Sequence, residues 1–159
     1  MKKYFIMLCM AALSASVFAQ TVKSLSSPDG NIRVDVSIDK GITYDVFCGN
    51  EQVLSDCRLS MDIEGNVLGS LPKLQSVKRQ KVNDVKHPFL KLKFAEVPNS
   101  YNEMTLVMKG YYSVVFRAYN DGMAYRFVTS LKGEVEVNHE DITVFFPEDA
   151  QLVLQQSDR

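Results

Sequence analysis

Two arginines stand out among the 159 residues of this chain as side chains whose spacing could do chemistry. Arg117 and Arg126 flank the turn sequence Asn120-Asp121-Gly122. Asp-Gly readily forms a two-residue hairpin loop, which would set the two arginines directly opposite each other on one sheet face. Like charges placed in this way repel. The pattern therefore predicts either a three-residue loop with a bulge that shifts the pairing, or a carboxylate between the two guanidinium groups.

Three acidic side chains are candidates for that carboxylate, namely Glu103, Asp62 and Glu64. A structural salt-bridge network on a sheet face is one interpretation of the arginines and carboxylates together. The other is a clamp for an anion or a substrate. The residues alone leave both interpretations open.

Other catalytic arrangements are absent from the sequence. It contains no glycine-rich phosphate loop, no Ser/His/Asp set and no Cys/His spacing typical of a metal site. His87 precedes Pro88 in a loop-like segment and His139 lies in a polar stretch, so neither is typical of a catalytic base. We predict no catalytic residue and no metal ligand in this chain.

Composition excludes further classes of function. With 18 basic and 19 acidic residues the net charge is −1, and a nucleic-acid-binding protein would usually carry a basic surplus. Tyr111, Tyr112 and Tyr119 could stack on sugar rings, although aromatic residues of a β-sandwich more often fill its core. The absence of tryptophan weakens the case for a free-standing sugar-binding module.

The elements that must position these side chains are strands. Apolar residues alternate with polar ones through most of the chain after residue 20, and turn sequences such as Pro28-Asp29-Gly30 and Gly49-Asn50 separate the runs. We expect about ten strands, with apolar positions in the segments 23–27, 32–38, 42–48, 59–63, 90–94, 104–108, 112–118, 123–129, 135–137 and 142–146. Residues 73–86 are expected to be exposed strand or loop, and Pro98-Asn99-Ser100 to close a strand. The pattern predicts an all-β, antiparallel sandwich of two sheets.

The first nineteen residues are predicted to be a secretory signal peptide. Lys2 and Lys3 precede the apolar stretch Phe5–Ala15, and Val17-Phe18-Ala19 offers small residues at a cleavage site before Gln20. A second apolar run long enough to span a membrane is absent. We therefore expect a signal peptide at 1–19, a sandwich domain at 20–159, and a periplasmic protein with no membrane contact after cleavage.

Export would permit a disulfide between Cys48 and Cys57. Cys48 abuts the Gly49-Asn50 turn, however, so its cross-strand neighbour should lie near Glu51 and not at Cys57. Two reduced, buried cysteines are the favoured expectation.

Three segments carry a family pattern: Ser27-Pro28-Asp29-Gly30-Asn31, Ser100–Leu106 and Phe116–Phe127. The last, F-R-A-Y-x-D-G-x-A-Y-R-F, is the most specific. Leu54–Leu59 lies where the family has a strand that enters a Ser-Arg-Leu-Gly-like stretch, with Cys57 in place of the serine. From about Ser24 to Pro147 the chain resembles the N-terminal domain of glycoside hydrolase family 97, the SusB-type α-glucosidases and α-galactosidases.

This resemblance implies a β-supersandwich resembling galactose mutarotase, which in the family packs against a catalytic (β/α)₈ barrel. Such a barrel needs about 250 residues, so the 140 residues after the signal peptide are too few for one. The family's catalytic carboxylates and most of its calcium ligands lie on the barrel. No calcium ligand carries over to Glu148–Arg159, so calcium is expected only in the full-length enzyme, and the sandwich is expected to be incomplete at its C-terminus.

The resemblance therefore implies an accessory domain of an exported α-glycoside hydrolase that is not catalytic by itself. Its implied partners are the catalytic barrel and an α-linked oligosaccharide. A stand-alone periplasmic carbohydrate-binding sandwich and a protein-interaction sandwich are the alternatives. The candidates for ligand binding or for docking onto the barrel are Asn102, Glu103, Arg117, Asp121 and Arg126.

Overall fold

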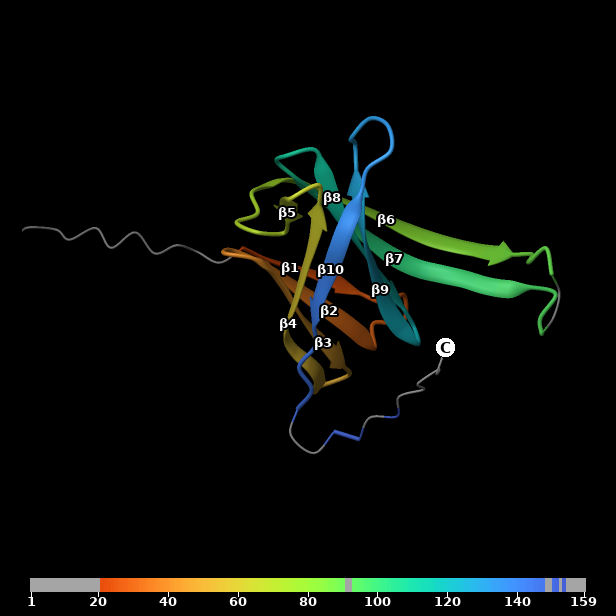
Figure 1. Ribbon diagram of the computed structural model, residues 1–159. Coiled ribbons are helices and arrows are strands. Elements are labelled where there is room, and N and C mark those ends of the chain that lie inside the picture. The colour runs from red at the N-terminus through yellow and green to blue at the C-terminus, as the bar shows by residue number, and fades with distance from the viewer. Residues whose placement is uncertain (1–20, 91–92, 148–149, 152, 154–159) are drawn as a thin grey trace, which may run out of the picture.

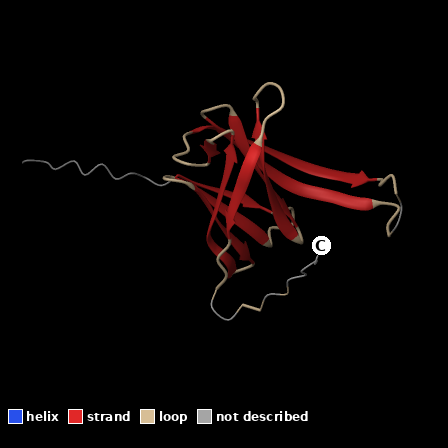
Figure 2. Ribbon diagram, viewed as in Figure 1, coloured by secondary structure: helices blue, strands red, loops and turns tan. Residues whose placement is uncertain are grey.

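The computed structural model describes residues 21–90, 93–147, 150–151 and 153, and shows ten strands in two antiparallel sheets (Figures 1 and 2). The prediction of an all-β, antiparallel sandwich is confirmed. The predicted signal peptide lies outside the described residues. Among the residues that are described, no helix is long and apolar enough to cross a membrane.

The first sheet has the strand order β1-β2-β3-β4-β10, with the short β5 paired to the end of β4. Its strands are β1 (Thr21–Ser26), β2 (Ile32–Ile38), β3 (Ile42–Cys48), β4 (Glu51–Ile63), β5 (Asn66–Leu68) and β10 (Val137–Thr143). The predicted turn at Pro28-Asp29-Gly30 joins β1 to β2, where the Gly30 amide donates to the Ser27 carbonyl oxygen at 3.0 Å.

The second sheet has the order β6-β7-β8-β9, from β6 (Leu74–Lys86), β7 (Val97–Met108), β8 (Tyr112–Tyr119) and β9 (Gly122–Thr129). β8 pairs with β7 only between Asn102 and Val107, whereas β6 pairs with β7 along almost its whole length. The outer halves of β6 and β7 therefore form a two-stranded arm that projects from the sandwich (Figure 1).

The core lies between the two sheets and follows the alternation of the sequence. Every second residue of β2 is buried, as are the alternating residues of β7 and β8 that face them. Tyr44 of β3 reaches across to Phe116 of β8, with ring centroids 6.0 Å apart in an edge-on contact. The fully buried side chains that fill this interface are Val34, Val36, Ile42, Cys57, Met104, Leu106, Met108, Val114 and Phe116.

Two strand predictions around the arm are wrong. Residues 87–90 and 93–96 form loops and bends instead of a strand, with residues 91–92 outside the description. The sequence Pro98-Asn99-Ser100 does not end a strand but lies within β7, where Pro98 pairs with Val85. One edge of β7 is free at this point, so a proline without an amide hydrogen is tolerated. The apolar residues Phe89, Leu90 and Phe94 are consequently exposed near the arm's tip.

The two cysteines are not bridged, and Cys48 pairs across the hairpin with Glu51 as expected. Cys57 is buried, whereas Cys48 is exposed. The expectation of a reduced pair is confirmed, and the expectation that both are buried is wrong for Cys48, because it is the last residue of β3 beside the turn.

Candidate functional site

Glu103 is the centre of a polar cluster on the outer face of the second sheet, the face that points away from the core. It comes from β7, where its neighbours Met104 and Leu106 face inward and leave the odd-numbered positions outside. Its Oε1 accepts a hydrogen bond from Gln80 Nε2 on β6 at 2.7 Å, and its Oε2 accepts one from Arg117 Nε on β8, also at 2.7 Å. We call Glu103, Gln80, Arg117 and Tyr101 the Glu103 cluster.

The Arg117 guanidinium is held by an ion pair and by an aromatic ring. It lies over the ring of Tyr101, with 4.4 Å between its Cζ and the ring centroid, and Tyr101 in turn packs on Tyr119 at 5.0 Å. Burial acts to lower the pKa of Arg117, but hydrogen bonds to Glu103 and Tyr119 outweigh it, so the pKa lies above its ordinary value. Arg117 is a permanent cation held in one place.

The register of the β8–β9 hairpin differs from the one expected from Asp121-Gly122. Tyr119 pairs with Gly122, so the two loop residues are Asn120 and Asp121. Arg117 then lies opposite Ala124, and Arg126 opposite Val115. The two arginines are therefore not opposite each other, and the prediction of a three-residue loop with a bulge or of a carboxylate between them is wrong, because a two-residue loop one position earlier already separates them.

The five candidate residues do not form one site. Glu103, Arg117 and Arg126 lie on the outer face of the second sheet. Glu103 forms an ion pair with Arg117 and not with Arg126, which is exposed. Asn102 points the other way and donates from Nδ2 to the Ser26 carbonyl oxygen of β1 at 2.7 Å, which ties the two sheets together. Asp121 lies exposed in the turn. Of the carboxylates weighed for Arg117, Glu103 is the partner, while Asp62 lies in the other sheet.

The geometry of the Glu103 cluster limits what it can do chemically. Both carboxylate oxygens of Glu103 are hydrogen-bonded, and its side chain is only 9% exposed. An acid, base or nucleophile needs a free oxygen within reach of a substrate. The cluster therefore acts as a structural network. On this face, the partly exposed guanidinium of Arg117 and the side chain of Arg126 can still contact another molecule.

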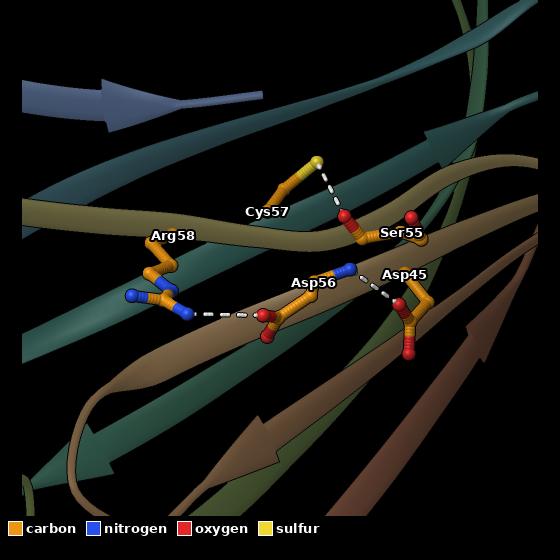
Figure 3. Close-up of polar contacts among 5 residues, drawn as sticks. All are labelled: Asp45, Ser55, Asp56, Cys57 and Arg58. Atoms are coloured by element: carbon orange, nitrogen blue, oxygen red, sulfur yellow. Dashed lines mark hydrogen bonds and ion pairs between the residues drawn. The ribbon is translucent and has the colours of Figure 1, made fainter. Parts of the chain in front are cut away.

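A second polar cluster lies at a bulge between β3 and β4 and was not predicted from the sequence. The register between these strands shifts after Tyr44, and Asp56 adopts a positive φ of 48°. Its amide donates to Asp45 Oδ1 at 2.8 Å, so a side chain replaces the missing ladder acceptor (Figure 3). Asp56 Oδ2 also accepts from Arg58 Nη2 at 3.1 Å. The one signal in the sequence is the aspartate itself, a residue type that tolerates positive φ, just before the predicted strand 59–63.

This bulge borders an open cleft of about 650 Å³ on the first sheet. Thr43, Arg58 and Thr143 lie side by side on adjacent strands along the cleft. Ten of its fifteen lining residues carry a hydroxyl group or a charge, and no aromatic ring lines it among the described residues: Ser37, Asp39, Lys40, Gly41, Ile42, Thr43, Asp56, Arg58, Leu59, Ser60, Val67, Gly69, Ser70, Asp141 and Thr143.

The described residues do not offer a donor set for calcium. Among them, no three histidine, cysteine, aspartate or glutamate side chains gather closely enough to hold a metal ion. Calcium prefers six to eight oxygen ligands. The cleft beside Asp56 therefore does not fit the ion without further ligands.

Comparison with known proteins shows which enzymes resemble this sandwich. A retaining α-galactosidase of Bacteroides thetaiotaomicron is 38% identical over 151 residues, which is 94% of this chain and 22% of the galactosidase. A glycoside hydrolase family 97 enzyme from Pseudoalteromonas sp. strain K8, solved in complex with acarbose, superposes with a TM-score of 0.64 at 22% identity, over 76% of this chain and 20% of that one. A β-arabinopyranosidase superposes with a TM-score of 0.71 at 22% identity, over 79% and 21% of the two chains.

The chain thus spans about a fifth of the length of the enzymes that it matches. The family model for the N-terminal region of glycosyl hydrolase family 97 matches residues 25–159, which is most of the chain. The resemblance expected from the three sequence segments is confirmed, and this chain belongs to glycosyl hydrolase family 97, as its N-terminal domain.

Proposed function

We propose that this chain is the accessory N-terminal domain of an exported α-glycoside hydrolase, which supports a catalytic barrel and does not hydrolyse glycosides by itself. The observation that carries the proposal is the extent of the match: 94% of this chain aligns with only 22% of a retaining α-galactosidase. The remainder of that enzyme, nearly four fifths of its length, is long enough to include a barrel of about 250 residues.

The chemistry of the described side chains supports a non-catalytic role. A glycosidase needs two carboxyl groups on either side of the scissile bond, about 5–9.5 Å apart. Glu103 is the single charged side chain buried in the described part of the chain, and both of its oxygens are engaged. Arg117 and Arg126 remain available as contacts for the catalytic domain.

A stand-alone carbohydrate-binding sandwich is the second candidate, and the cleft beside Asp56 and Arg58 is the observation in its favour. Its hydroxyl groups and charges could hydrogen-bond to an α-linked oligosaccharide. Sugar sites usually combine such groups with an apolar or aromatic surface, and this cleft has no aromatic ring in its lining. The supporting role is therefore the stronger proposal.

Calcium and export belong to the same proposal. We assign calcium to the complete enzyme, with ligands mostly from the catalytic domain, as the resemblance to the family implies. We assign the protein to the periplasm on the predicted signal peptide, and N-terminal sequencing of the exported chain should then begin at Gln20.

A chimera tests the proposal. The matched segment of the Bacteroides thetaiotaomicron α-galactosidase is replaced by this chain, and a second variant of the galactosidase simply lacks the segment. If this chain is a supporting domain, the chimera hydrolyses an aryl α-galactoside and the deletion variant does not. A soluble chimera that is no more active than the deletion variant would contradict the proposal.

A further inference from the structure

A hollow of about 430 Å³ lies where the segment around β5 meets the turn between β7 and β8. We call it the Tyr111 hollow. Its volume is in the range of sites for small molecules, and it combines apolar surface with a few polar side chains, as such sites do. The lining includes three large apolar side chains and three charged ones, namely Leu71, Tyr111 and Leu131, and Glu64, Lys73 and Lys109.

Three residues that line this hollow have a strained backbone. Glu64, Leu71 and Tyr111 adopt φ angles of +51°, +46° and +66°. In this left-handed region a side chain crowds its own backbone, so each conformation costs free energy. Only one other non-glycine residue in the described part of the chain, Asp56, has a positive φ. Strain of this kind gathers at ligand-binding surfaces, where the surrounding structure holds it in place.

Hydrogen bonds to distant segments hold all three residues in these conformations. The Glu64 amide donates to the carbonyl oxygen of the residue before β10 at 3.1 Å, and the Leu71 amide donates to that of Lys40 at 3.2 Å. The Tyr111 carbonyl oxygen accepts two hydrogen bonds from Ser130, from the amide at 2.9 Å and from Oγ at 3.2 Å. The backbone around the hollow is therefore fixed without any ligand.

Tyr111 presents its ring to solvent. It is 76% exposed, whereas the adjacent Tyr112 is 8% exposed and belongs to the core. Of the three tyrosines that the sequence offers for stacking on sugar rings, Tyr119 packs on Tyr101, with 5.0 Å between the ring centroids. Tyr111 is therefore the one with a free ring. An aromatic ring on a fixed backbone is a flat apolar platform that loses little freedom when it binds a ligand.

Charged groups of both signs line the same hollow. The Lys109 amide donates to the Lys73 carbonyl oxygen at 2.9 Å, so the two lysines are neighbours. Neither they nor Glu64 take part in an ion pair within the described residues. A carboxylate accepts hydrogen bonds from hydroxyl groups, and an ammonium group donates to them. A site selective for an ion would instead be lined by one sign of charge.

We propose that the Tyr111 hollow binds a neutral pyranose ring of an oligosaccharide. The apolar face of the sugar lies on the Tyr111 ring, and its hydroxyl groups are directed toward Glu64, Lys73 and Lys109. A pyranose ring combines an apolar face with a rim of hydroxyl groups, so it uses both kinds of surface at once. The cleft beside Asp56 lacks such an aromatic platform. The choice of α-linked sugars as ligands rests on the proposed function.

Titration of this chain with maltotriose and with raffinose tests the site, because the first is α-linked glucose and the second carries an α-linked galactose. Amide NMR signals report the contact. We expect the signals of residues 64–73 and 109–112 to shift at millimolar sugar, and those of the outer arm of β6 and β7 to stay in place. No shift at about 100 mM of either sugar would overturn the proposal. The measurement uses this chain alone, so its outcome is independent of the activity of the chimera, which tests the proposed function.

A matched pair of exposed aromatic residues separates stacking from general surface effects. Tyr111→Ala should weaken sugar binding by about tenfold or more, because the platform is lost. Tyr111→Phe keeps the ring and should bind like the parent. Phe89→Ala is the control, since Phe89 is 99% exposed near the tip of the arm, and it should also bind like the parent. Unchanged binding by Tyr111→Ala, or equal weakening by Phe89→Ala, would overturn the proposal.

Tyr111→Gly distinguishes a binding role from a structural one. Glycine adopts a φ of +66° without strain, so this variant should lose sugar binding and yet unfold at a temperature no lower than the parent. A thermal midpoint several degrees below that of the parent would show that the ring holds the fold together and would overturn the proposal. Absence of sugar binding in this chain, with Tyr111 protected from iodination in the chimera, would identify the catalytic domain as the occupant and would overturn it as well.

Discussion

Arg117 and Arg126 show how much the surroundings of one side chain decide its role. Both arginines lie on the outer face of the second sheet, on adjacent strands. Arg117 has the buried Glu103 at 2.7 Å and the ring of Tyr101 beneath it, whereas Arg126 is exposed and takes part in no ion pair within the described residues. The two residues should therefore respond differently to the same substitution.

Replacing Arg117 by methionine should lower the free energy of unfolding by about 2 kcal/mol, because Glu103 would remain buried with a single partner. This is less than the 3–5 kcal/mol of a fully buried pair, since Arg117 is 30% exposed. Arg126→Met is the matched control and should leave stability within about 0.5 kcal/mol of the parent. Urea unfolding of the three proteins measures both effects, and equal losses in the two variants would contradict this account of the cluster.

Ionisation of Tyr44 should lower the free energy of unfolding at alkaline pH. Burial, with a further contribution from the neighbouring Cys57, raises its pKa from 10.0 to about 12. The folded state therefore holds the phenolic proton more tightly than the unfolded state. The resulting stabilisation is complete below pH 10 and is lost as the pH rises toward 12, by about 2–3 kcal/mol.

Urea unfolding between pH 9 and pH 11.5 tests this effect. Tyr44→Phe should give a flatter decline of stability with pH than the parent, because the ionisable group is gone. Tyr111→Phe, a change at an exposed ring, should follow the parent profile. If Tyr44→Phe declines as steeply as the parent, burial of Tyr44 does not control its ionisation.

At the scale of elements, alternation predicted the strands that pack one face on the core, and failed along the outer half of the arm of β6 and β7. β2, β3, β8 and β9 lie close to their expected positions because one face of each is buried. The outer half of the arm of β6 and β7 is mostly exposed, so burial imposes little pattern there, and the sequence predicts a strand end at Pro98-Asn99-Ser100 that the structure does not have. The bulge at Asp56 and the hairpin register at Asn120-Asp121 depend on backbone hydrogen bonding, which residue types specify only weakly.

The loop after β5 depends on a glycine. Gly69 has a φ of +88°, and a Cβ atom placed there would lie 2.9 Å from the carbonyl oxygen of Leu59. Its amide also donates to the hydroxyl oxygen of Tyr112 in the other sheet at 3.2 Å. Gly69→Ala should therefore cost about 2–3 kcal/mol through combined backbone strain and steric conflict.

Gly65→Ala provides the control for that substitution. Gly65 also has a positive φ, of +81°, but no atom lies within 4 Å of a Cβ placed there. It should cost only about 1 kcal/mol, from the backbone conformation alone. Equal losses for the two variants in urea unfolding would show that the contact with Leu59 has no energetic weight.

At the scale of the whole molecule, the sequence predicted the fold class and the family. The residues proposed as candidates for one site, however, lie in separate places on the domain. The segment Phe116–Phe127, whose pattern indicates the family, contributes Phe116 and Ala118 to the core and Arg117 to the Glu103 cluster. Asn102 and Arg117 are near each other in the pairing of β7 and β8 but project to opposite faces, which a list of polar residues does not reveal. The cleft at the bulge draws on β3, β4 and β10, and its parts are far apart in sequence.

The central claim is that this domain supports catalysis without performing it, and turnover by the purified chain tests the claim most directly. A homogeneous sample is incubated with aryl α-glucosides and aryl α-galactosides, with calcium and with a chelator, beside the intact α-galactosidase of Bacteroides thetaiotaomicron as a positive control. We expect no hydrolysis above the uncatalysed rate in either condition. Calcium-dependent hydrolysis that stays with the protein through repeated purification would contradict the claim and require a catalytic centre within these 159 residues.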